Sequence, residues 1–68
     1  MKLTLECEKE GDGRWIAEVL ELPGVLAYGQ TIAEASTKVQ ALALRVIAER
    51  LEHGESPPDP LSITFEAA

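Results

Sequence analysis

The residues of this 68-residue chain that are best suited to chemistry are three glutamates. Glu6 and Glu8 are two positions apart, so they share a face if this segment is a strand, and Glu18 could lie opposite them on a second strand. Carboxylates that bridge two metal ions would permit phosphodiester hydrolysis. The same side chains are also typical of a solvated strand face, and we favour this simpler interpretation. We therefore predict no metal site.

The single histidine and the single cysteine have structural interpretations. His53 precedes Gly54 at the expected end of a helix, where a protonated imidazole interacts favourably with the helix dipole. Cys7 lies on the apolar side of an alternating segment, which indicates a packed thiol. The Gly-Asp-Gly turn at 11–13 lacks the lysine and the following helix of a phosphate-binding loop. We therefore predict no catalytic residue and no cofactor, and expect that the chain is not an enzyme.

Length and composition limit how such a domain can be stable. A chain of 68 residues with 46% apolar and 26% charged side chains is globular. A domain of this size buries only about 60% of the surface that its unfolded chain exposes. One cysteine cannot form an internal disulfide, and one histidine with one cysteine cannot complete a usual zinc site. We therefore expect residues 1–68 to form one domain that is stabilised by self-association, as a homodimer or a higher homo-oligomer.

The composition also indicates location and partners. A lone cysteine suggests a reducing compartment, no apolar run approaches the ~18 residues of a membrane span, and the first residues lack the apolar region of a signal peptide. Twelve acidic against six basic residues give a net charge of −6, a surface that phosphate would avoid. We therefore expect a cytoplasmic protein without membrane or direct nucleic-acid contact. The acidic balance fits a basic protein partner, and it fits equally a domain that the charge merely keeps soluble.

Alternation of apolar and polar residues predicts strands, and apolar spacings of three and four predict a helix. Thr31 and Glu34 can form a capping box at the start of this helix, and Gly54 is a natural stop. The prolines within 56–60 favour an extended connector. The predicted order is β-β-β-α-β, with strands over 2–10, 14–20, 25–28 and 61–66 and a helix over 32–53.

The connections between these elements predict the topology. Short turns make the first three strands a meander, and a right-handed crossover through the helix places the fourth strand beside the first. We therefore expect an α+β domain with sheet order 3-2-1-4 and one helix packed on one face. The second strand is apolar on both sides, so its other face needs a cover from another chain. We expect the oligomer or partner interface to include Trp15, Ile16, Leu20, Leu22, Pro23 and Tyr28.

Five short motifs run in order along the chain: DGRWIA at 12–17, ELPG at 21–24, GQT at 29–31, EA at 34–35 and GESPPDP at 54–60. Each has a structural reason to be present, since the motifs supply turn glycines, a helix cap and strand fillers. In this order and spacing they resemble the pattern of the HicB antitoxin family, over about residues 1–66. Ala33 and Pro57 depart from that pattern, which often has a glutamate and a β-branched residue or leucine at these positions.

The resemblance implies a partial RNase-H-like fold that has lost its catalysis. It also implies a function: binding a HicA-like toxin, a small basic mRNA-cleaving ribonuclease, and inhibiting it by covering its catalytic histidine and RNA surface. HicB antitoxins usually continue into a C-terminal DNA-binding domain, whereas this sequence ends at Ala68. The expectation is therefore of the toxin-binding domain alone, without operator binding.

A second hypothesis comes from a different class of protein. The apolar second face of strand 14–20 also fits a stand-alone homo-oligomeric module that has no toxin partner. Such a module would bind a small ligand or another protein. A stable homo-oligomer with a ligand-sized cavity at its interface would favour this alternative.

Overall fold

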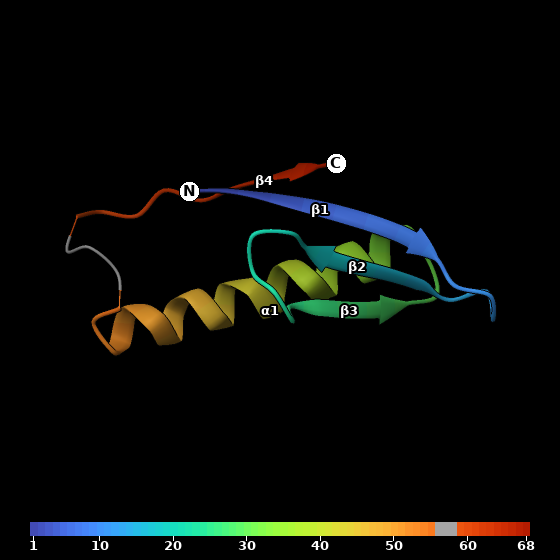
Figure 1. Cartoon of the computed structure of the whole chain (residues 1–68), viewed down its shortest axis with the longest axis horizontal. Helices are drawn as coiled ribbons and strands as arrows, with labels where there is room; N and C mark the ends of the chain where they lie inside the picture. The colour runs from blue at the N-terminus through green and yellow to red at the C-terminus, as the bar shows by residue number, and fades with distance from the viewer. Residues whose placement is uncertain (56–58) are drawn as a thin grey trace.

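The structure is a computed structural model that describes residues 1–55 and 59–68. Its elements follow the predicted β-β-β-α-β order (Figure 1). Part of the expected extended connector, residues 56–58, lies outside the described residues. The elements are β1 (Lys2–Lys9), β2 (Trp15–Val19), β3 (Leu26–Gly29), α1 (Ile32–Glu52) and β4 (Thr64–Ala67).

The four strands form one mixed sheet in the order β3-β2-β1-β4, which confirms the predicted topology. β1 is antiparallel to β2 and parallel to β4, and β2 is antiparallel to β3. The fourth strand begins later than predicted, because its first residue, Thr64, already lies opposite Lys2 at the start of β1. Residues 61–63 therefore precede the segment that β1 can pair with.

The core lies between α1 and one face of the sheet. Alternate residues of β1 and β2 point into it, and the helix contributes residues at spacings of three and four, as its apolar pattern predicts. Leu3, Val19 and Val39 are the largest side chains that are almost fully buried. The buried core consists of Leu3, Leu5, Ala17, Val19, Leu22, Val25, Ala35, Val39, Ala43 and Ile47.

Both ends of α1 are closed by local hydrogen bonds. The Thr31 hydroxyl accepts from the Glu34 N–H at 3.1 Å, which is the first half of the predicted capping box. At the other end, Gly54 has a positive φ of 70° and donates to Leu51. The N–H of Glu55 donates to Arg50. These two bonds form a Schellman motif, which satisfies the last carbonyls of the helix and ends it after Glu52.

The helix lies nearer one edge of the sheet than the other. It packs mainly against β3 and β2, with fewer contacts to β1 (Figure 1). The closest approach is at Gly29, where an added Cβ would lie 2.5 Å from the backbone nitrogen of Ala35. Glycine at the end of β3 therefore lets the first turn of α1 approach the sheet, and β4 at the far edge receives less cover.

Candidate protein-binding face of the sheet

The face of the sheet that α1 leaves uncovered is called the open face. It carries the strand residues that alternate with those of the core, so its composition follows from the period of two along each strand. It mixes carboxylates with apolar side chains. Its residues are Lys2, Thr4, Glu6, Glu8, Ile16, Glu18, Leu26, Tyr28, Thr64 and Glu66, together with Leu20, which follows β2 and donates its N–H to the Thr4 carbonyl.

Two carboxylates face each other at the centre of the open face. Glu6 on β1 lies directly opposite Glu18 on β2, and Glu8 is on the same face two residues further along β1. Both members of the pair are exposed. Like charges directly opposite each other on antiparallel strands are destabilising. The sheet therefore concentrates negative charge here although its own stability does not benefit.

Apolar side chains flank this charge toward the β3 edge. Leu20, Leu26 and Tyr28 are 47%, 38% and 39% exposed. Ile16 lies between Glu8 and Tyr28 in the strand register and is half-buried. The open face thus combines a hydrophobic part with a charged centre, the composition that protein-binding surfaces use.

The hairpin between β1 and β2 holds a cation beside this apolar part. The Arg14 guanidinium carbon lies 4.5 Å from the centroid of the Tyr28 ring. Asp12 Oδ1 accepts from the Arg14 backbone N–H at 3.0 Å, and Asp12 Oδ2 pairs with Arg14 Nε at 2.7 Å. Both bonds hold the pKa of Asp12 below its usual value, and the bond from the Arg14 backbone has the larger effect. Arg14 is therefore engaged by both neighbours and offsets little of the charge on the three glutamates.

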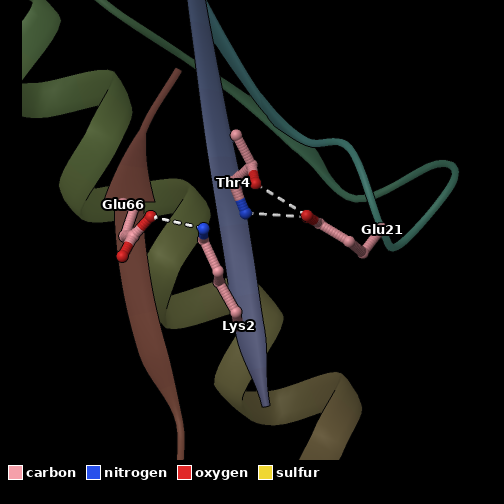
Figure 2. A network of polar contacts seen from close by, with 4 residues as sticks. All are labelled: Lys2, Thr4, Glu21 and Glu66. Carbon is pink, nitrogen blue, oxygen red and sulfur yellow. Dashed lines mark hydrogen bonds and ion pairs between the residues drawn. The ribbon is translucent and has the colours of Figure 1, made fainter.

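The turn after β2 is attached to β1 by a carboxylate (Figure 2). Glu21 accepts two hydrogen bonds of 2.7 Å, one from the Thr4 N–H and one from the Thr4 hydroxyl. Both bonds lower the pKa of Glu21, and the bond from the Thr4 N–H has the larger effect. The Thr4 carbonyl in turn accepts from the N–H of Leu20. Glu21 and Leu20 therefore extend the hydrogen bonding between β1 and the chain beyond the end of β2, and Leu20 lies beside Thr4 on the open face.

On the other side of β1, Lys2 pairs with Glu66 of β4 at 3.0 Å (Figure 2). Both side chains are well exposed, so this ion pair contributes little stability. It does place the one lysine of the open face next to a carboxylate, away from the Glu6–Glu18 pair. Among the described residues of the open face, the carboxylates of Glu6 and Glu18 between β1 and β2 therefore have no paired cation, whereas the carboxylate of Glu66 on β4 is paired with Lys2.

The structure brings only part of the sequence-predicted interface together. Ile16, Leu20 and Tyr28 lie on the open face, and Pro23 is exposed in the adjoining turn. Trp15 is half-buried on the helix side and packs against the core, and Leu22 is itself a core residue with 5% exposure. A partner on the open face does not reach these last two side chains.

Leu26 belongs to the exposed apolar part of the open face and is absent from the sequence-based prediction. The signal for it is the alternation of Leu26 and Tyr28 with the small residues Ala27 and Gly29. Small residues at alternate positions indicate the side on which the helix packs closely, so the two large residues must point the other way.

The structure brings Glu6, Glu8 and Glu18 onto one face but places His53 and Cys7 apart from them. Within residues 1–55 and 59–68, no group of three histidine, cysteine, aspartate or glutamate side chains has the geometry to hold a metal ion. His53 is the C-cap of α1, and Cys7 is a half-buried free thiol packed against the core. These positions agree with the structural roles that the sequence predicts for them.

Comparison with family models, curated proteins and solved structures found no match to the chain. In the part of the chain that the structure describes, no helix has the length and apolar character needed to cross a membrane.

Proposed function

We propose that this chain is an antitoxin-type inhibitor that binds a small basic HicA-like mRNA-cleaving toxin through the open face. The motif resemblance to the HicB family suggests this class of partner. The sheet order β3-β2-β1-β4 with one helix is also what a partial RNase-H-like fold would have. In this proposal the domain is not an enzyme, and it acts in the cytoplasm by covering the toxin's RNA surface and catalytic histidine.

The observation that carries the proposal is the opposed Glu6–Glu18 pair beside exposed apolar residues. A basic side chain from a partner would relieve this repulsion, whereas phosphate would increase it. The apolar side chains of Leu20, Leu26 and Tyr28 would be removed from water in the same complex. Charge would then steer the encounter and give specificity, and apolar contact would hold the complex together.

A pair of charge reversals tests this proposal. Glu18→Lys places a cation at the centre of the open face, and Glu49→Lys makes the same change in net charge on the exposed side of α1. Binding is measured with a purified HicA-like toxin from the same host, at ionic strengths of about 50 mM and about 500 mM. The toxin's RNase activity is the second readout.

We expect Glu18→Lys to weaken binding by about tenfold or more and to release the RNase activity, and Glu49→Lys to change the affinity by less than about twofold. High salt should weaken the wild-type complex because the encounter is electrostatic. Equal effects of both variants, or no binding by the wild type even at low salt, would exclude the open face as the toxin site. Urea denaturation of each variant controls for folding.

The second candidate is a stand-alone homo-oligomeric module without a toxin partner. The exposed leucines and Tyr28 favour it, because contact with a second copy of the chain would remove them from water as well as a toxin would. Binding of a toxin to the open face of a self-associated chain is compatible with the first candidate. A homo-oligomer that buries its own open face and leaves toxin activity unchanged would favour the second.

A further inference from the structure

The outer edge of the sheet at β4 has backbone groups that turn away from β1. The N–H of Thr64 donates to Met1 at 2.8 Å, and the N–H of Ala68 donates to Leu5 at 2.8 Å. Successive residues of a strand turn their backbone groups to opposite sides, so Phe65 and Ala67 direct theirs toward the free edge. β4 is the last strand of the sheet on this side. It can therefore accept a further strand.

The β4 edge carries little of the protection that proteins usually place at a sheet edge. The residues Thr64–Ala67 include no lysine and no proline. The one charged side chain, Glu66, lies on the open face and pairs with Lys2 of β1 at 3.0 Å. At the opposite edge, the first turn of α1 packs closely on the core face of β3 at Gly29. The two edges thus differ in how far the helix covers their core face, and β4 is the less covered one.

The core side of β4 is also incompletely covered. Ile63 and Phe65 pack against the core but remain half-buried, because α1 lies closer to β3 and β2. Leu42 and Val46 of the helix are half-buried in the same way. Leu61, just before this segment, is 40% exposed. An added strand with its own helix would cover these side chains together with the backbone edge.

The chain is elongated and exposes somewhat more surface than an average monomer of its size. Its radius of gyration is 12.9 Å, compared with about 11 Å for a compact domain of this length. Its accessible surface is 4597 Å², compared with about 4,200 Å² for a monomer of 7.4 kDa. A standard interface takes about 800 Å² from each partner, which is about a sixth of this surface. The β4 edge and the apolar side chains beside it, Leu61, Ile63 and Phe65, would form part of that area.

We propose that a second copy of this chain pairs with β4 in antiparallel orientation, with Phe65 opposite its own counterpart. The two sheets would join into one of eight strands with both helices on the same side. Phe65 would exchange two hydrogen bonds with its counterpart, and Ile63 would pair with Ala67 of the other copy. The open faces of both copies would remain accessible, so this inference is independent of the proposed function.

Charge selects this register over the neighbouring one. With the two-fold axis at Phe65, each Glu66 lies opposite Thr64 of the other copy, and each keeps its own ion pair with Lys2. With the axis at Glu66, the two Glu66 side chains would lie directly opposite each other, which is destabilising. The Phe65 register also brings the two half-buried phenyl rings together on the helix side.

Salt separates this association from toxin binding. Each copy carries a net charge of −6, so two copies repel each other at long range and added salt should strengthen the dimer. A complex with a basic toxin should weaken under the same change. Failure of the dimer and failure of the toxin complex are therefore distinguishable in one sedimentation series over protein and salt concentration.

The main test is N-methylation of one backbone amide in chemically synthesised chains. N-methyl-Phe65 blocks the outer edge of β4 and leaves the ladder with β1 intact. The matched control is N-methyl-Tyr28. The Val25 carbonyl accepts from the Val19 N–H, so the backbone groups of every second residue from Val25 turn toward β2. The N–H of Tyr28, which lies between two of these residues, therefore turns toward the outer edge of β3. Circular dichroism shows whether each variant is folded.

We expect a wild-type dimer whose dissociation constant rises by about tenfold or more with N-methyl-Phe65 and changes by less than about twofold with N-methyl-Tyr28. A monomeric wild type at every concentration and salt, or an equal loss with both variants, overturns the proposal. So does a dimer that is weakened only by N-methyl-Tyr28, because that result assigns the contact to β3.

Disulfide formation tests the register itself in a Cys7→Ala background. Thr64 and Glu66 of the other copy would form a non-hydrogen-bonded pair with Cα atoms ~4.5 Å apart, which a disulfide can span. A mixture of Thr64→Cys and Glu66→Cys chains should cross-link under mild oxidation, and Thr64→Cys alone should not. Cross-linking of Thr64→Cys with itself, or none in a mixture that sediments as a dimer, overturns the Phe65 register.

Discussion

The close contact between Gly29 and α1 leaves no room for a side chain at position 29. In Gly29→Ala, the new Cβ would lie 2.5 Å from the Ala35 nitrogen and 3.0 Å from the Glu34 carbonyl carbon, whereas ordinary contact begins at 3.4 Å. Both neighbours are backbone atoms of the first turn, so the helix or β3 must move by almost 1 Å. Gly29 has no positive φ, so the effect is purely steric.

Overpacking of this kind costs about 1–3 kcal/mol, and the smaller unfolded-state entropy of alanine offsets about 0.4–1 kcal/mol of it. We therefore expect Gly29→Ala to lower the free energy of unfolding by about 1–2 kcal/mol. An unfolding entropy of about 2.1 cal/mol/K for each of 68 residues converts this loss into a Tm decrease of about 7–14 °C.

The assay is thermal and urea denaturation at one fixed protein concentration, because self-association would make Tm depend on concentration. Gly11→Ala is the matched control: it has no atom within 4 Å of the added Cβ and no positive φ. We expect Gly11→Ala to stay within about 0.5 kcal/mol of the wild type. If Gly29→Ala were as stable as Gly11→Ala, the close approach of α1 to β3 would be refuted.

Three further predictions concern the open face and the core. The lowered pKa of Glu21 means that its bonds to Thr4 stabilise the fold above pH 4.5, its ordinary pKa, and that this stability is lost as the pH falls through the lowered value. In urea denaturation measured at several pH values, the free energy of unfolding of Glu21→Gln should therefore fall less steeply with acid than that of the wild type. An unchanged dependence on pH would count against this bond. Glu18→Gln should raise the urea midpoint slightly, because it relieves the repulsion with Glu6, while toxin affinity falls; a lower midpoint would contradict the opposed pair. Leu3→Ala should cost about 2–5 kcal/mol in urea denaturation, since Leu3 is 1% exposed, and a loss below 1 kcal/mol would argue against its burial.

Much of the fold follows from short-range patterns in the sequence. The alternation around Leu3 and Leu5 predicts β1, and the apolar spacing through Val39 and Ile47 predicts α1, because burial on one face requires these periods. The handedness of the crossover then predicts the sheet order, which the structure confirms. These features need no knowledge of distant contacts.

The candidate site follows less directly from the sequence, because β2 has apolar residues on both faces. The period of two separates Trp15 from Ile16, but it does not say which of the two faces the helix. That choice depends on where α1 packs, and the contact with Gly29 at the end of β3 fixes it. The bond of Glu21 to Thr4 joins residues that are 17 positions apart, so no local pattern indicates it.

A backbone NMR titration of this chain with a purified HicA-like toxin tests whether the toxin binds the open face. We expect the largest amide shift changes at low salt to fall on residues of the open face around Glu6, Glu18 and Leu26, and to shrink at high salt. Little change is expected along the exposed side of α1 near Glu49. Shift changes centred on α1, or none in the presence of excess toxin, would exclude the open face as the toxin site.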